Sequence, residues 1–531
     1  MITSRRKFLK QAGGAILLPF MGSQLLGRSR AAYFAVHGFI ENNPDAVFIM
    51  KTNVDNKTNA SAIKQAGLDF AGSVFVGTDD AKIGIPFSHT YVMKPNLTAW
   101  RWDNDSIPFE NVMGVITDVN FVEGIIEHMK TMGISADDIH LREVNGTENM
   151  TEGGYGAMAV RTGADVQVIN ESITTISQEK IQWIDVPEGL FFTKIPYLSP
   201  VNAENSWLLN IAKFKAHGMG LTLCAKNLQG SIVNNYQKHC DSFNYIRPEL
   251  NTNHIRENTF TLIRANYNRH LAEGVPRWNT PGLDSGGGLG METWASRCTD
   301  NNSVTRPGLH VIEGIYGRDG NGFYHGPHNG AGQDFLTNII IFGKNAYHVD
   351  IIGHYLGGHE PGNFGLFHLA KDRGLSVFLN PMDIPLYEWH TDGSAAKKEL
   401  TTFTRTPLLT RYLRQDGENE YHLINQPYDY SLTSVAAQTA FQKPEAFVLN
   451  QNYPNPFNPV TTIQFNLSNA GNVRIEVYNS LGEKVAILAD GYFGKGAHMV
   501  NWNAGRVSSG TYYYRMRSGM YTQTRRMVVV R

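Results

Sequence analysis

The chain has 531 residues, of which 42% are apolar and 18% charged, with 47 lysines and arginines against 48 aspartates and glutamates. This length predicts two or more domains, and the composition excludes a disordered chain. A net charge of -1 gives no general attraction for nucleic acid, so we expect no nucleic-acid partner. The cysteines, Cys224, Cys240 and Cys298, are one short of the set that an iron–sulfur cluster needs, so no such cluster is expected.

The first 32 residues join a basic start to a short apolar run. Arg5 and Arg6 precede Phe8, and the apolar residues 12–26 are interrupted by glycines and a proline. A run of this kind does not suit a membrane helix, which needs about 20 strongly apolar residues. The segment resembles a twin-arginine signal peptide, which implies the twin-arginine translocase as a partner and no transmembrane helix in the mature protein.

Between residues 33 and 430, short apolar strands alternate with helical stretches, which predicts a layered α/β domain. Apolar residues at helical spacing before Gly133 predict an amphipathic helix over 118–132, and a second helix is expected over 155–161. Periodicity then fades, and we expect a linker at residues 431–445. The expected strands are residues 47–50, 90–93, 139–144, 166–169 and 207–211.

Two basic clusters in this domain are candidates for a ligand site. Lys94, Pro95 and Asn96 directly follow an apolar strand, and α/β folds bind ligands at the carboxyl ends of their strands. The second cluster combines lysines, a histidine and an amide, which suit a carboxylate or phosphate group. Taken alone, it also fits a solvated basic turn. Its residues are Lys213, Lys215, His217, Lys226, Asn227 and Gly230.

A third cluster, rich in glycine and histidine, lies later in the domain. Its glycines would let the backbone approach a ligand closely, but their spacing is not that of a phosphate loop. Asp350 and His354 are four residues apart and would share one face of a helix. The cluster comprises Glu313, Gly314, Gly317, Gly320, Gly322, His325, His328, His348, Asp350, His354 and His359.

In this order, the three clusters resemble the domain of unknown function 362 family. That family shares a Lys-Pro-Asn strand end, a Lys-x-Lys-x-His segment leading into Lys-Asn-x-x-Gly, and a later acidic-Gly-Ile with Gly-x-Gly. Two departures are visible: Glu313 stands where aspartate is expected, and the ferredoxin-like cysteine motifs of some relatives are absent. The resemblance implies a domain type without an established activity. It also supports ligand-binding roles for Lys94, Asn96, Lys213, Asn227, Gly230, Glu313, Gly320 and Gly322.

Three hypotheses for function remain open at this point. In the first, the domain is an enzyme or binder for a small anionic or carbonyl ligand, with Lys215, His217 and Lys226 as catalytic candidates, since crowding lowers a lysine's proton affinity. In the second, a divalent metal such as zinc, iron or nickel is the cofactor. In the third, the protein binds glycan or another envelope component without catalysis. The candidate metal ligands are His325, His328, Asp350, His354 and His359.

Residues 446–531 form short alternating segments punctuated by turn residues, which predicts a small Ig-like β-sandwich. The opening, from Asn455 through Pro456, Phe457 and Asn458 to Pro459, resembles the start of the C-terminal sorting domain of type IX secretion cargo. This resemblance implies the type IX secretion machinery as a partner and delivery to the outer-membrane surface or the extracellular space. The alternative is a carbohydrate-binding or adhesive module.

Overall fold

The computed structural model describes residues 31–101, 104, 106–240, 250–272, 290–411, 421–430, 447–449, 451–452, 455–467, 471–480, 483–494, 496–505, 507–518 and 521–530. The chain divides into two compact units, residues 1–428 and 429–531. The expected signal peptide, except for Ala31 and Ala32, and the expected linker at 431–445 lie outside the described residues. Within the described part of the chain, no helix is long and apolar enough to cross a membrane.

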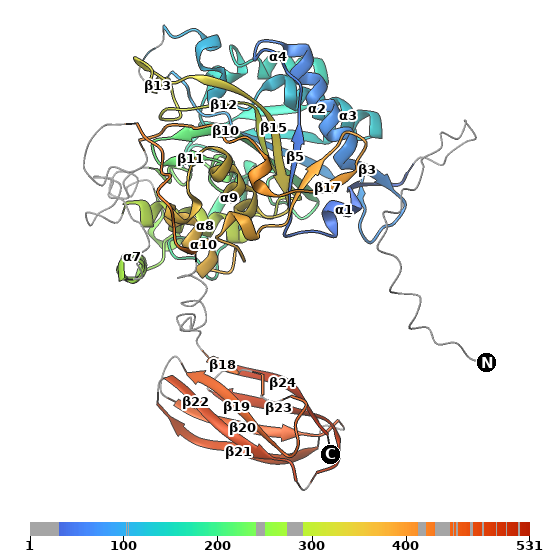
Figure 1. The fold of residues 1–531 in the computed structure, drawn as a ribbon, viewed down its shortest axis with the longest axis vertical. Helices are drawn as coiled ribbons and strands as arrows, with labels where there is room; N and C mark the ends of the chain where they lie inside the picture. The colour runs from blue at the N-terminus through green and yellow to red at the C-terminus, as the bar shows by residue number, and fades with distance from the viewer. Residues whose placement is uncertain are drawn as a thin grey trace, which may run out of the picture. The chain divides into compact units, whose positions relative to one another are not determined.

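A ten-stranded sheet runs through the first unit (Figure 1). All its strands run parallel except β15, β17 and β11, so the domain is built mainly from parallel crossovers. The strands expected at residues 47–50, 90–93, 139–144, 166–169 and 207–211 are confirmed as β2, β5, β6, β7 and β10. The order across the sheet is β17 (Ala395–Lys397), β16 (Leu386–Trp389), β2 (Val47–Lys51), β15 (Asp334–Gly343), β12 (Leu309–Arg318), β10 (Ser206–His217), β5 (Thr90–Pro95), β6 (Ile139–Glu143) and β7 (Asp165–Val168), with β11 (Gly220–Thr222) beside β10.

Both faces of the sheet are covered, because its strands are apolar on both sides. On β5, Tyr91 and Met93 belong to one apolar core, whereas Val92 between them belongs to another. The first face packs against α2 (Ala60–Val74), α3 (Val119–Met132) and α4 (Tyr155–Thr162) (Figure 1). The second lies under α5 (Cys224–Asn227), α8 (Gly290–Val304), α9 (Ala346–Leu356) and α10 (Gly365–Asp372). The layered α/β expectation is therefore confirmed.

The expected amphipathic helix is confirmed as α3. Asp118 caps its first turn by accepting a hydrogen bond from the Asn120 N–H, and Gly133 ends it with φ of 113°. The expected helix at 155–161 is α4. Smaller elements surround the sheet: β1 (Tyr33–Val36), α1 (Gly38–Glu41), β3 (Phe75–Thr78), β4 (Ile85–Pro86), β8 (Ile181–Asp185), β9 (Lys194–Leu198), α7 (Thr259–Ala272), β13 (His325–Gly326) and β14 (Gly330–Ala331).

The second unit consists of two antiparallel sheets that share one apolar core. Phe465 and Trp502 come from one sheet, and Ile475 and Tyr514 come from the other. The first sheet has the order β18 (Phe447–Leu449), β19 (Val460–Leu467) and β22 (Gly496–Asn503). The second has the order β21 (Lys484–Phe493), β20 (Gly471–Tyr478), β23 (Gly510–Ser518) and β24 (Tyr521–Val529).

The parallel strands β5, β6 and β10 bring distant segments to one edge of the large sheet. Residues Trp207 to Ile211 of β10 lie beside Tyr91 to Pro95 of β5, and β5 in turn lies beside β6. Because parallel strands present their carboxyl ends at the same edge, the segments that follow β5 and β6 and the end of β10 meet there.

Candidate functional site

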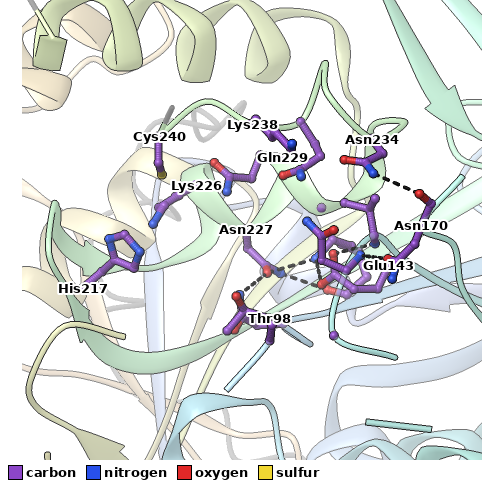
Figure 2. Close-up of a pocket in the computed structure, with 18 of the residues that line it drawn as sticks. Thr98, Glu143, Asn170, His217, Lys226, Asn227, Gln229, Asn234, Lys238 and Cys240 are labelled. Atoms are coloured by element: carbon purple, nitrogen blue, oxygen red, sulfur yellow. Dashed lines mark hydrogen bonds and ion pairs between the residues drawn. The ribbon is translucent and has the colours of Figure 1, made fainter. Parts of the chain in front are cut away.

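A cavity of about 740 Å³ lies at this edge of the sheet. This volume is within the range of small-molecule pockets, about 300–1,000 Å³. The cavity brings together two basic clusters that are more than 100 residues apart in the chain. Figure 2 shows several of its side chains converging. The sequence-predicted residues that line it are Lys94, Asn96, Lys215, His217, Lys226, Asn227 and Gly230.

Lys94 is held inside the protein by a buried ion pair. Its Nζ lies 2.7 Å from Glu143 Oε2, and the lysine is completely buried. Burial lowers the pKa of Lys94, and the Glu143 carboxylate opposes that shift. Gly230 is required beside this pair, because an added Cβ would come within 1.8 Å of Glu143 Oε1. Lys94 and Gly230 thus shape the wall of the cavity.

Asn227 connects the ion pair to the neighbouring strands. Its Oδ1 accepts hydrogen bonds from Lys94 Nζ and Asn96 Nδ2, at 3.1 and 3.0 Å. Its Nδ2 donates to the Lys94 carbonyl and to Asn210 Oδ1, at 3.0 and 2.8 Å. All the hydrogen-bonding capacity of this amide is therefore used within the protein. Asn227 fixes the end of α5 against the strand ends.

Asp350 anchors the other end of α5. Asp350 lies on α9, and its carboxylate accepts hydrogen bonds from the backbone N–H groups of Cys224 and Ala225, at 2.7 and 2.8 Å. Burial raises the pKa of Asp350 to about 7, although these two N–H donors favour its charged form. Since α5 carries Lys226, Asp350 positions that lysine. Its carboxylate is engaged here and does not meet the other residues expected to bind metal.

The basic end of the cavity is formed by Lys215, His217 and Lys226. Burial, followed by the charge of Lys226, holds the pKa of Lys215 well below its ordinary value. Burial, followed by Lys226 and Lys215, holds the pKa of His217 well below its ordinary value. His217 Nδ1 accepts from the Met219 N–H at 3.2 Å, so the neutral ring carries its proton on Nε2. The cavity therefore holds a neutral imidazole beside crowded amines.

Cys240 lies beside Lys226 in the cavity wall, as Figure 2 shows. Burial lowers the pKa of Lys226, and interactions with Cys240 and Cys298 oppose that shift. No sequence pattern indicates this contact, because Cys240 stands in no recognisable motif. The free thiol of Cys240 is one of the groups that line the cavity.

Lys213 and Glu313, which were expected to bind ligand, do not line the cavity. Lys213 Nζ lies 2.6 Å from Glu313 Oε2, and both side chains are fully buried. The ammonium also lies 3.4 Å from the centre of the Tyr316 ring, and Glu313 accepts from the Asp118 N–H. The two charges neutralise each other inside the domain, so the expectation that they contact the ligand is corrected.

Gly320 and Gly322 of the third cluster shape the turn beside the cavity and are not part of its lining. Gly320 has φ of 103°, and an added Cβ would meet the His325 carbonyl at 2.5 Å. Gly322 has φ of 87°, and its added Cβ would meet His217 Cδ2 at 2.5 Å. Glycine at 322 therefore leaves room for the His217 ring.

The structure does not gather the five candidate metal ligands. His328 Nε2 lies 2.7 Å from Asp319 Oδ2, and His359 bonds the Leu408 carbonyl and the Ile424 N–H through its two nitrogens. His354 packs against phenylalanine rings, and His325 lies against the Tyr324 ring. Among the described residues, no three His, Cys, Asp or Glu side chains are placed to hold a metal ion. These residues do not fit the divalent metal considered above.

Several residues of the cavity wall were missed from the sequence. Glu143 is the next-to-last residue of the expected strand 139–144 and the last residue of β6, so the rule that places ligands at strand ends could have identified it. The asparagine and glutamine side chains of the wall come from separate loops, and their positions in the sequence form no recognisable motif. The missed residues include Thr98, Glu143, Asn145, Asn170, Gln229, Asn234, Lys238 and Cys240.

Comparison with known families agrees with this division of the chain. Residues 92–354 match the family model described as Domain of unknown function (DUF362), and residues 451–530 match the one described as Secretion system C-terminal sorting domain. The chain therefore carries a DUF362 domain followed by a type IX sorting domain. The sorting domain indicates export to the outer-membrane surface or the extracellular space.

Comparison with individual proteins adds little to the family matches. No curated protein matches the chain. Among solved structures, PorZ, a surface component of the type IX secretion system of Porphyromonas gingivalis, is similar at 22% identity. The similarity covers 15% of this chain and only 11% of PorZ, and the TM-score of 0.12 establishes no shared fold.

We predict that Lys94→Met lowers the free energy of unfolding by about 3–5 kcal/mol, because it leaves Glu143 buried without its partner. Chemical denaturation of the full chain measures this loss. The matched control is Lys180→Met, which removes an ion pair of 3.5 Å to Glu171 between half-exposed side chains and should cost less than about 1 kcal/mol. Equal effects of the two substitutions would contradict a structural role for Lys94.

Proposed function

We propose that this chain is an exported, surface-directed protein whose DUF362 domain binds a small anionic or carbonyl compound in the cavity. One observation carries the proposal. Lys215 and Lys226 line a single cavity, are 1% and 5% exposed, and have no carboxylate within ion-pair distance among the described residues. Buried ammonium groups without a counter-charge are costly, and an anionic ligand would supply that charge.

The same residues suit proton transfer to or from a bound compound. A lysine with a lowered pKa can accept a proton, and the Nε2–H of neutral His217 can donate a hydrogen bond. Charge that develops on the ligand would be met by Lys226. We assign Lys215 as the candidate base, His217 as the hydrogen-bond donor and Lys226 as the electrostatic partner. A binding protein needs only the last of these roles, whereas an enzyme needs all three.

We predict that the full chain binds inorganic phosphate or sulfate and that Lys226→Met weakens this binding at least about tenfold, since a hydrogen bond to a charged group contributes about 1.5–3 kcal/mol. Isothermal titration calorimetry measures the affinities. Lys180→Met, which is outside the cavity lining, serves as the control and should leave them unchanged. Absence of binding by the unmodified chain, or equal binding by Lys226→Met, would refute the proposal.

For export, we propose that residues 1–32 direct the chain through the twin-arginine translocase and that residues 446–531 form the Ig-like sandwich that the type IX machinery recognises. The paired arginines before Phe8 support the first part. The two antiparallel sheets with one shared core support the second. The twin-arginine translocase carries proteins that are already folded. Such a route is compatible with this domain, because its cavity forms only when residues from distant segments have come together.

We predict that replacing Arg5 and Arg6 together by lysine retains the unprocessed chain in the cytoplasm, because the paired arginines are the feature that the translocase recognises. Cell fractionation with immunoblotting measures the distribution. The control replaces Arg28 and Arg30 by lysine, which preserves charge at the far end of the same segment. Undiminished export of the Arg5/Arg6 variant would indicate a different route across the inner membrane.

A further inference from the structure

The cavity has two chemically different ends. Figure 2 shows His217, Lys226 and Cys240 together at one end, and Asn170 and Asn234 at the other. The first end is basic, whereas the second is rich in amides and also holds the Glu143 carboxylate, which is paired with Lys94. A simple anion would need only the first end. The different side chains at the two ends of the cavity therefore imply a ligand with two kinds of polar group.

The amide end is fixed by its own hydrogen bonds. Asn234 Nδ2 donates to the Asn170 carbonyl at 2.9 Å, and Asn170 Oδ1 accepts from the Asn145 N–H at 2.7 Å. These contacts join the loops that follow β6 and β7 to the segment that follows α5. An amide has two N–H donors and a carbonyl acceptor, so fixed amides can pair with hydroxyl groups, which both donate and accept.

Two amide oxygens in the cavity wall are buried and lack a donor. Asn96 Oδ1 and Gln229 Oε1 have no hydrogen-bond partner within the described residues, and Asn96 is only 7% exposed. Buried amide oxygens in proteins nearly always accept a hydrogen bond. A ligand hydroxyl would satisfy them. A ligand ammonium group would be repelled by Lys215 and Lys226.

The aromatic content of the wall narrows the ligand class further. Apart from the His217 imidazole, Phe323 has the one aromatic ring among the described lining residues. The Phe323 ring lies against His217, with 6.0 Å between the ring centres. Among these described lining residues, a flat base or other aromatic ligand would find no second ring on which to stack. Recognition at the amide end therefore depends on hydrogen bonds.

From these observations we infer that the ligand is a polyhydroxylated anion, that is, a sugar phosphate or a sugar acid. Its charged group lies among Lys215, His217 and Lys226, and its hydroxyl groups donate to Asn96 and Gln229 and bond the amides beyond them. This inference rests on the proposed function and adds the substrate class to it.

Calorimetry of the full chain tests the inference with glucose 6-phosphate against inorganic phosphate, and with glucuronate against acetate. At least one of the two sugar anions should bind at least about tenfold more tightly than phosphate or acetate, its counterpart without a sugar. The reason is that the unpaired oxygens of Asn96 and Gln229 discriminate against a ligand that has no hydroxyl groups to donate to them. Gln229→Met removes one acceptor at nearly constant size and should reduce that advantage without weakening phosphate binding. Gln65→Met, on α2 and outside the cavity lining, is the matched control.

The possible outcomes separate this inference from the proposed function. Equal affinities within both pairs would overturn the inference and leave anion binding intact. Failure of all the anions to bind, or binding of uncharged glucose as tight as that of glucose 6-phosphate, would overturn both. A full advantage retained in Gln229→Met would overturn the role assigned to its side chain.

Discussion

The buried ion pair between Lys94 and Glu143 is the interaction on which the cavity depends. It joins β5 to β6, and its lysine also donates to Asn227 at the end of α5. A buried pair is tolerated only where further hydrogen bonds satisfy both charges. Glu143 receives them from the backbone N–H groups of Leu97 and Val144. The strand ends and α5 are therefore held in place without any ligand.

The lysines of the basic clusters are of two kinds, those with a buried glutamate partner and those without one in the described part of the chain. Lys94 and Lys213 each have a buried glutamate partner, so their charges are used within the fold. Lys215 and Lys226 have none among the described residues and line the cavity. Lys215 and Lys226 are therefore the lysines that can interact with a ligand, because the protonation of these two side chains depends on what the cavity contains. The first pair supplies rigidity, and Asp350 keeps Lys226 in position.

The sequence was sufficient where local periodicity decides structure. Alternation and helical spacing identified β5, β6 and α3, and the strand-end rule placed Lys94 and Asn96 at the cavity. It was insufficient where a distant partner decides the role of a side chain. Nothing in the pattern shows that Glu313 neutralises Lys213 from 100 residues away, or that His359 bonds to backbone groups. The roles of Lys215, His217 and Lys226 in catalysis stay predictions.

The most direct measurement is the number of protons that the chain takes up when sulfate enters the cavity. Sulfate itself does not titrate near neutral pH, and calorimetry in buffers of different ionisation enthalpy gives the number. Burial and Lys226 lower the pKa of Lys215 in the empty site, and a bound anion would raise it. We therefore predict proton uptake and tighter binding as the pH falls, with less uptake in Lys215→Met. Binding without proton uptake would contradict an anion site built on buried lysines whose pKa values are lowered in the empty cavity.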